Sequence, residues 1–417
     1  MDDVEQKQNL FFVHIVHNYF KNLVVDLDTF TSIYKKRQMV YNTPMKEECS
    51  DKPDWAPHGD HDAFAVRVRQ GIEGHSIVRT ASPLFPKKRI HLSVDEYVAG
   101  VLKRDKTILG RAITLIESNS PSHYQMAREV LQRLLPHTGG SLRIGITGVP
   151  GAGKSTLIET FGCYLVEQGH HVAVLAVDPS STVSGGSILG DKTRMEKLSR
   201  LPECFIRPSP SSGTLGGVTR KSRETLLVCE AAGFDVILIE TVGVGQSEIT
   251  VRSMVDFFLL LMIAGAGDEL QGIKKGVIEL ADALLVNKAD GQNKMRADLA
   301  RNEYDTALKY LSPATQGWKT QAFTCSALTG EGIAQIWNLI KEFQTLTMAT
   351  SVFQERRNQQ SLSWVFSMIE EYLKESFYGD ANVKKELAEL KPQVLGGTCL
   401  PVAATEKLLN AYFLNKN

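Results

Sequence analysis

Gly148-Val149-Pro150-Gly151-Ala152-Gly153-Lys154-Ser155-Thr156 is a glycine-rich stretch that contains the pattern G-x-x-x-x-G-K-[ST]. The apolar run 142–147 precedes it and predicts a buried strand, while the residues that follow predict the start of a helix. Between a strand and a helix, glycines allow backbone N–H groups to turn inward and cradle phosphates. Lys154 then faces the β- and γ-phosphates, and the Ser155 hydroxyl can bind Mg²⁺. The stretch therefore predicts a nucleoside triphosphate site.

A second motif indicates which base is bound. Asn287-Lys288-Ala289-Asp290 follows the apolar run 283–286, and N-K-x-D at a strand end is the guanine-reading arrangement of GTPases. The Asp290 carboxylate can accept from guanine N1–H and from the exocyclic amine, whereas adenine leaves it unpaired at a cost of about 1–3 kcal/mol. Asn287 is expected to tie this loop to the phosphate loop, and the Lys288 stem to cover the base.

A third strand, predicted over 321–325, ends in Ser326-Ala327-Leu328, whose backbone N–H groups can meet guanine O6. By itself, N-K-x-D also fits a solvated loop. Because it follows a phosphate loop and precedes this segment, the order of the motifs favours GTP over ATP.

Three acidic residues near strand ends suggest a metal site. Asp178 follows the apolar run 171–177, Asp191 lies further on, and Glu240 ends the run 236–239. Mg²⁺ prefers oxygen ligands and often keeps water between itself and a carboxylate. Together with Ser155, these acids are the predicted metal residues. Capping of the segment that follows is the alternative role, and it weighs most for Asp191.

Two further segments predict switch-like behaviour. Gly243 can give its backbone N–H to the γ-phosphate, so that hydrolysis releases the loop. No side chain identifies itself as the base, and Gln246 is the candidate for orienting water, by analogy with glutamine in other GTPases. The glycine-punctuated loop 265–271, after an apolar strand, fits a mobile segment near the nucleotide, with a simple surface loop as the alternative.

The order of apolar runs predicts an α/β fold. From 141 to 345, strands and helices alternate, which implies a P-loop GTPase domain with a mostly parallel sheet covered by helices. We expect a poorly specified extension over 1–85, a helical subdomain over 86–140 that starts with a capping box at Ser93 and Glu96, and a helical region over 346–417. The strands are predicted at 142–147, 171–177, 204–207, 236–240, 257–263, 283–286 and 321–325.

Composition excludes several classes of protein. The 417 residues carry 47 basic and 47 acidic side chains, so net charge gives no support for nucleic-acid binding. No apolar run is long enough to span a membrane. The six cysteines include no C-x-x-C, which suggests neither a disulfide frame nor zinc, and indicates a reducing compartment. The start Met1-Asp2-Asp3-Val4-Glu5 is acidic, unlike a typical mitochondrial presequence.

The C-terminal helical region contains apolar stripes that need a partner. The same chain or a second subunit can supply it, and both remain open; we predict that the region forms a dimer. The residues are Leu387, Leu390, Val394, Leu408, Leu409 and Phe413.

Several longer blocks carry a family resemblance. The sequence from about Ser93 to the C-terminus resembles the MeaB/ArgK-type P-loop GTPases. Besides the two nucleotide motifs, the blocks are AVDPSS at 176–181, GGSILGDKTRM at 185–195, RPSPSSGTLGG at 207–217, ETVGVGQSE at 240–248 and GAGDELQGIK at 265–274.

The resemblance implies a homodimeric chaperone that uses GTP to gate adenosylcobalamin delivery to methylmalonyl-CoA mutase and to protect or reactivate that enzyme. Animal members act in the mitochondrial matrix, although a cytoplasmic location stays open because of the acidic start. By motif, Asp268, Gln271 and Lys274 fall on a mobile loop that responds to the mutase. No cobalamin motif is visible, so we expect the partner enzyme to hold the corrinoid.

A partner that orders this loop would bring Lys274 to the transition-state charge, and we therefore expect low intrinsic GTP turnover that the partner stimulates. Lys154, Gln246 and Lys274 are the predicted catalytic residues. The alternative function is a metal-insertion GTPase of the nickel-enzyme type, which usually shows Cys or His clusters. A kinase or transport ATPase is disfavoured by Asn287 to Asp290.

Overall fold

The fold was analysed in a computed structural model, which describes residues 92–118, 120–177, 195–208, 215–241, 247–265 and 276–413. Among these residues, no helix is both long enough and apolar enough to cross a membrane. Residues 88–417 form one compact unit, which contains all the elements described below.

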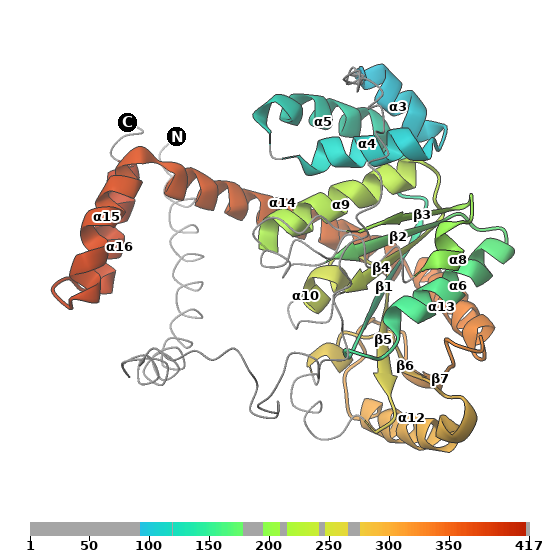
Figure 1. The fold of residues 1–417 in the computed structure, drawn as a ribbon. Helices are drawn as coiled ribbons and strands as arrows, with labels where there is room; N and C mark the ends of the chain where they lie inside the picture. The colour runs from blue at the N-terminus through green and yellow to red at the C-terminus, as the bar shows by residue number, and fades with distance from the viewer. Residues whose placement is uncertain are drawn as a thin grey trace, which may run out of the picture. The chain divides into compact units, whose positions relative to one another are not determined.

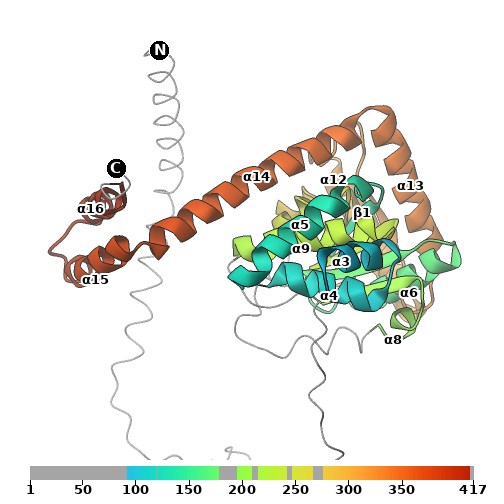
Figure 2. The same cartoon turned by 90° about the horizontal axis from the view of Figure 1, so that it is seen from above.

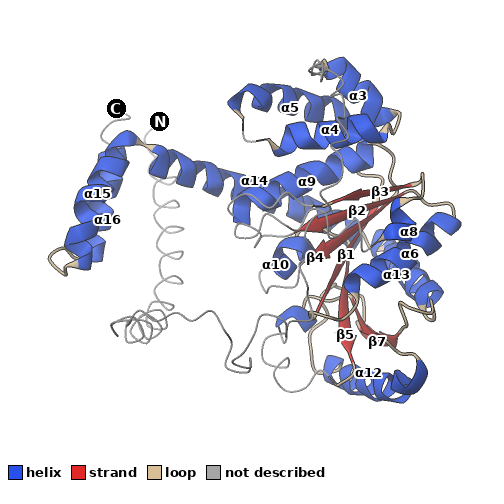
Figure 3. Ribbon diagram, in the orientation of Figure 1, coloured by secondary structure: helices blue, strands red, loops and turns tan. Residues whose placement is uncertain are grey.

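Seven strands form one parallel sheet in the order β3-β2-β4-β1-β5-β6-β7. Figures 1 and 3 show it as a central layer between helices. The predicted α/β fold is confirmed, and the predicted strands agree with the structure to within one residue at each end. The strands are β1 Leu142–Gly148, β2 Val172–Val177, β3 Cys204–Arg207, β4 Val236–Thr241, β5 Phe257–Ile263, β6 Ala283–Asn287 and β7 Gln321–Thr324.

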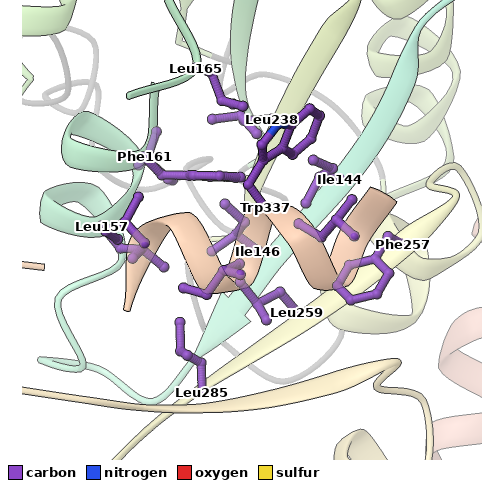
Figure 4. Packing of buried hydrophobic residues seen from close by; sticks show 14 of the residues in the cluster. Ile144, Ile146, Leu157, Phe161, Leu165, Leu238, Phe257, Leu259, Leu285 and Trp337 are labelled. Carbon is purple, nitrogen blue, oxygen red and sulfur yellow. The ribbon is translucent and has the colours of Figure 1, made fainter. Parts of the chain in front are cut away.

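Alternate side chains of the strands enter two different cores, because successive residues of a strand point to opposite faces. On one face, Ile144 and Ile146 of β1 pack with Phe161 of α6 (Lys154–Glu167) and Trp337 of α13 (Ile333–Ala349), as Figure 4 shows. Helix α8 (Glu196–Ser199) covers the same face. Strands buried on both sides explain the near-continuous apolar runs in the sequence.

The opposite face is covered by α9 (Leu215–Ala231) and α10 (Ser247–Arg252). Their core continues without a break into α3 (Val94–Leu102), α4 (Lys106–Glu117) and α5 (Pro121–Leu134), which lie on α9 (Figures 1 and 2). The predicted capping box is present at the start of α3. The helices before the phosphate loop therefore share the core of the nucleotide domain, and a short 3-10 turn (Leu135–His137) connects them to β1.

The remaining helices lie toward the C-terminus. A 3-10 turn (Gly291–Asn293) leads into α12 (Lys294–Leu308), which packs on β6 and β7. Helix α13 runs into the 28-residue α14 (Val352–Gly379), visible in Figure 2, and α15 (Ala381–Leu395) pairs with α16 (Pro401–Phe413). That pairing buries Leu390 of the predicted apolar stripes, whereas Phe413 is exposed.

Candidate nucleotide site

The phosphate loop joins the carboxyl end of β1 to α6. Gly153 has a φ of 89°, in the left-handed region that favours glycine, and a Cβ there would lie 2.8 Å from Nδ2 of Asn287. A Cβ at Gly148 would lie 2.5 Å from the carbonyl oxygen of Leu261 on β5. The glycines of the motif are therefore required by neighbouring strands as well as by the turn. Pro150, Gly151 and Thr156 are exposed, while Val149 and Ala152 are buried beneath the loop.

Helix α6 begins at Lys154, and no side chain caps its first turn. The backbone N–H groups of an uncapped first turn, together with the helix dipole, attract an anion. The Lys154 ammonium donates to the carbonyl oxygens of Gly148 at 3.1 Å and Val149 at 3.5 Å. Burial lowers the pKa of Lys154, and the charges of Glu240 and Glu248 act in the opposite direction. The amine is thus held by the loop that phosphates would enter.

Ser155 and Glu240 meet at the carboxyl ends of β1 and β4. The Ser155 hydroxyl donates to Oε1 of Glu240 at 3.1 Å, and Glu240 is buried within β4. A hydroxyl and a carboxylate beside a phosphate loop are oxygen donors of the kind that Mg²⁺ prefers, so these residues fit the predicted ion. Within the described ranges, however, no group of three or more metal-ligating His, Cys, Asp or Glu side chains occurs.

Asn287, at the end of β6, connects three segments of the site. Its Nδ2 donates to the carbonyl oxygen of Ala152 at 2.7 Å, and its Oδ1 accepts from the backbone N–H of Ala327 at 3.0 Å. The Cys325 thiol donates to the same oxygen at 3.4 Å. The sequence predicted the first of these contacts. The second and third come from the order of strands β6 and β7, which places residues almost 40 positions apart side by side.

Asp290 and Ser326 lie at the same edge, and the Ser326 hydroxyl donates to Oδ2 of Asp290 at 2.6 Å. The Ser326 oxygen also accepts from the backbone N–H of Thr329 at 3.1 Å. One carboxylate oxygen of Asp290 is therefore fixed by the S-A-L segment. Lys288 is exposed and has a φ of 62°, which is uncommon for a residue other than glycine.

The sequence suggested that the S-A-L segment (326–328) offers its backbone N–H groups to guanine O6, and the structure differs. The N–H of Ser326 donates to the carbonyl oxygen of Glu331, and that of Ala327 donates to Asn287. Leu328 is largely exposed. Thr160 of α6 holds the segment from below through a 2.7 Å bond to the carbonyl oxygen of Ala327.

The remaining predicted site residues lie outside the described residues. They are Asp178, Asp191, Gly243, Gln246, Asp268, Gln271 and Lys274. The structure therefore brings together the phosphate loop, Glu240 and the base-reading residues. The roles of the residues outside the described ranges stay predictions.

One buried carboxylate beside the site received no role from the sequence. Glu248, near the start of α10, is 2% exposed, and its charge acts on the Lys154 ammonium. It ends the ETVGVGQSE block, in which Glu240, Gly243 and Gln246 have predicted roles and Glu248 has none. The sequence pattern could not indicate that Glu248 is buried, because α10 has only six residues and shows no helical periodicity.

A parallel sheet with a phosphate loop after β1 and N-K-x-D after β6 defines a P-loop nucleotide-binding protein of the GTPase class. The family described as methylmalonyl-CoA mutase-associated GTPase MeaB matches residues 109–382. The chain belongs to this family of GTPases, which confirms the resemblance carried by the motifs.

Relatives and a solved structure support the assignment. The chain is 45% identical to the GTPase ArgK of Escherichia coli, over 75% of this chain and 95% of the relative. It is also 45% identical to the mitochondrial methylmalonic aciduria type A homolog of Mus musculus, over 76% of this chain and 79% of the relative. A crystal structure of a LAO/AO transport system kinase superposes with a TM-score of 0.63 at 38% identity, covering 76% of this chain and 96% of that chain.

Proposed function

We propose that this GTPase binds GTP with Mg²⁺ and uses GTP hydrolysis to gate the delivery of adenosylcobalamin to methylmalonyl-CoA mutase. In the same way it protects or reactivates that enzyme. The family description carries this proposal, because it names association with that enzyme for a match of two-thirds of the chain. The corrinoid is reached only through the partner enzyme, and the protein acts in the mitochondrial matrix. The mouse relative is named as mitochondrial, which supports the organelle.

Each residue has a proposed role in nucleotide binding. The backbone from Gly148 to Thr156 cradles the phosphates, and Lys154 exchanges its bonds to the loop carbonyls for bonds to the β- and γ-phosphates. Asp290, fixed by Ser326, reads guanine. Asn287 holds the two loops at a set separation, Lys288 covers the base, and guanine O6 meets Leu328 N–H or shares that of Ala327.

The metal and hydrolytic roles complete the proposal. Ser155 would hold Mg²⁺ directly, Glu240 and Asp178 would hold its outer shell, and Asp191 would be a further residue of the metal site. When bound, the ion neutralises negative charge on the phosphate oxygens. Gly243 contacts the γ-phosphate, and Gln246 orients the attacking water.

Calorimetric titration tests the nucleotide assignment. We expect GTP to bind with Mg²⁺ and ATP to compete poorly, because adenine leaves the Asp290 carboxylate unpaired. Equal affinity for the two nucleotides would overturn the base assignment and leave a P-loop protein of another class.

Coupling to the mutase requires a separate measurement. We expect slow phosphate release from the isolated protein and faster release with methylmalonyl-CoA mutase. The reason is that a positioned cation, such as an arginine finger, accelerates phosphoryl transfer by about 10³–10⁵-fold. Lys274→Ala should leave GTP affinity and basal turnover nearly unchanged and remove most of the stimulation. Lys294→Ala, which loses only an exposed ion pair with Glu331, is the matched control. Full stimulation of Lys274→Ala would show that the loop is a surface connection.

We also propose that the protein is a homodimer, with contacts from the C-terminal helices. The long helix α14 presents a stripe of exposed apolar side chains at helical spacing, which requires a partner in solution. The residues are Leu362, Val365, Phe366, Ile369 and Leu373. Light scattering should show a dimer for the intact chain and a monomer for the double variant Phe366→Asp, Ile369→Asp. A monomeric intact chain at micromolar concentration would contradict the proposal.

The alternative of metal insertion into a nickel enzyme receives no support from the family match. The description of the matched family names methylmalonyl-CoA mutase rather than a nickel enzyme. Co-purification of the mutase with this protein in the presence of a non-hydrolysable GTP analogue would separate the two functions.

A further inference from the structure

The turn that follows β7, residues 326–331, uses most of its backbone N–H groups to close itself. The N–H of Ser326 donates to the carbonyl oxygen of Glu331 at 3.0 Å, and that of Gly330 donates to the carbonyl oxygen of Ser326 at 2.9 Å. The N–H groups of Thr329 and Glu331 donate to the hydroxyls of Ser326 and Thr329, at 3.1 and 3.4 Å. These donors are therefore not available to a ligand unless the turn opens.

Ala327 and Leu328, in the middle of this turn, differ in the state of their N–H groups. Ala327 is buried, and its N–H donates to Oδ1 of Asn287 at 3.0 Å. The N–H of Leu328 donates to no group in the part of the chain that the structure describes, and Leu328 is 81% exposed. A backbone N–H always needs an acceptor. That of Leu328 is therefore the donor of this turn that a base can take without breaking a hydrogen bond of the protein.

A threonine of the phosphate-loop helix determines where this N–H points. Oγ1 of Thr160, on α6, donates to the carbonyl oxygen of Ala327 at 2.7 Å. The peptide bond between Ala327 and Leu328 is trans, so its C=O and its N–H point in opposite directions. Because the carbonyl oxygen is held by α6, the Leu328 N–H is directed away from that helix.

Ala327 is held from two elements at once. Asn287, at the end of β6, accepts from its N–H, and Thr160 donates to its carbonyl oxygen. A single hydrogen bond would let the residue pivot about it, whereas two bonds on its two sides fix the plane of the peptide that follows. The side chain of Leu328 is too exposed to fix that plane by packing. The Thr160 hydroxyl is therefore the contact that sets the direction of the Leu328 N–H.

We propose that Thr160 is a positioning residue for base recognition, which directs the Leu328 N–H toward O6 of guanine. The proposal rests on the proposed binding of GTP, and it deepens that function by naming the donor for O6 and the side chain that orients this donor. Asp290 is bound to the same turn through the Ser326 hydroxyl at 2.6 Å. One rigid turn then presents a donor to O6 and fixes the acceptor for N1–H and the 2-amino group.

An oriented N–H adds a repulsive element against adenine. The 6-amino group of adenine carries only donors toward this position, so the Leu328 N–H would face another donor and both would lose their acceptors. A site rejects a wrong ligand most strongly when binding leaves its polar groups unpaired. The fixed peptide plane matters here, because an N–H that could turn aside would remove the conflict.

Calorimetry on the full-length protein with three diphosphates tests the proposal without hydrolysis. They are GDP, inosine diphosphate, which lacks only the 2-amino group, and 2-aminopurine riboside diphosphate, which lacks O6 and N1–H. Thr160→Val keeps the branched shape and removes the hydroxyl. We expect it to weaken GDP and inosine diphosphate alike by about 3- to 10-fold, the value of one neutral hydrogen bond, and the 2-aminopurine compound by less than about twofold.

Two further variants serve as controls. Thr160→Ser keeps the hydroxyl and should restore the wild-type affinities for all three nucleotides. Thr345→Val removes an exposed hydroxyl that bonds only within α13, to the carbonyl oxygen of Lys341 at 2.8 Å, and should change none of them.

An amide signal of the wild-type protein gives a second measurement. In protein labelled with ¹⁵N-leucine, the Leu328 resonance is assigned with Leu328→Met. A hydrogen bond to O6 should move its proton resonance downfield with GDP and inosine diphosphate, and not with the 2-aminopurine compound.

The outcomes separate this proposal from the function on which it rests. An equal loss for all three nucleotides in Thr160→Val, or no loss for GDP, would overturn the role of Thr160 and leave guanine binding intact. The same Leu328 resonance with all three nucleotides would show that this N–H does not meet O6. If the wild-type protein bound none of them, the proposed function would fail as well. If Thr160→Val does not fold, Thr160→Ala takes its place with the same expected pattern.

Discussion

The base-reading edge and the junction of α9, α10 and α14 are both built from buried polar side chains, but they differ in how these are paired. At the edge, Asn287 uses its amide nitrogen and its oxygen on Ala152 and Ala327, and Ser326 both donates and accepts. At the junction, Arg223 of α9 donates to the carbonyl oxygens of Gln360 and Ser253 and to the Ser253 hydroxyl. Within the described residues it donates to no carboxylate, and its Nε stays unpaired.

This difference has a physical meaning. A fully paired network in a low-dielectric interior is rigid, since any movement leaves a polar group unsatisfied. A partly paired network loses fewer hydrogen bonds when its side chains rearrange. A rigid edge suits a site that must discriminate one base from another, and the less satisfied junction can rearrange at a smaller cost.

The largest expected effect is at the edge. Asn287→Ala leaves the Ala152 carbonyl and the Ala327 N–H buried without their partner, at about 1–3 kcal/mol for each group. We expect the free energy of unfolding to fall by about 2–4 kcal/mol in urea titration. Asn293→Ala, which loses one bond to the Lys288 carbonyl near the surface, should change it by less than about 0.5 kcal/mol. Similar losses for the two variants would mean that the edge is not more rigid than its surroundings.

A smaller effect is expected at Asp290, and on binding rather than folding. Asp290→Asn reverses donor and acceptor toward the base, so affinity for GTP should fall by about 1–3 kcal/mol and that for xanthosine triphosphate should rise. Calorimetry with both nucleotides measures the change. Glu303→Gln, at an exposed carboxylate of α12, serves as the control. Unchanged preference would show that Asp290 is held by Ser326 for structure alone.

The smallest effect is expected at the junction. Arg223→Met removes three hydrogen bonds but also relieves the burial of a charge that lacks a paired carboxylate, and these terms oppose each other. We expect a loss of only about 1 kcal/mol in urea titration, less than for Asn287→Ala although more bonds are removed. A loss as large as that of Asn287→Ala would erase the contrast between the two regions.

Much of the fold and of the nucleotide site could be predicted from the sequence. The strands were found because each is buried on both faces and reads as a continuous apolar run between turn residues. The phosphate loop and N-K-x-D were found because their geometry depends on residues adjacent in the chain. The meeting of Asn287 with the phosphate loop follows from the parallel sheet, whose carboxyl ends share one edge.

The roles of single groups across the sheet could not be predicted. Ser326 and Ala327 were expected to offer their N–H groups to guanine, yet both donate within the chain. The Ser326 bond closes a local turn to Glu331, whereas the position of β7 beside β6 decides the Ala327 bond to Asn287. The fate of the apolar stripes after residue 380 also depends on the tertiary structure, because the pairing of α15 with α16 buries Leu390. The longer exposed apolar stripe lies on α14.

Taken by itself, the sequence determined the class of nucleotide site and the parallel sheet, because both arise from patterns within a few residues of one another. It gave no role to Arg356 and Arg357, a charged pair that a solvated helix would also contain. The tertiary structure places Arg357 on Asp256, at 2.8 and 2.7 Å, and Arg356 near Asp282. These contacts join residues about a hundred and about seventy positions apart, and only the packing of α14 against the amino-terminal ends of β5 and β6 decides which carboxylate each arginine meets.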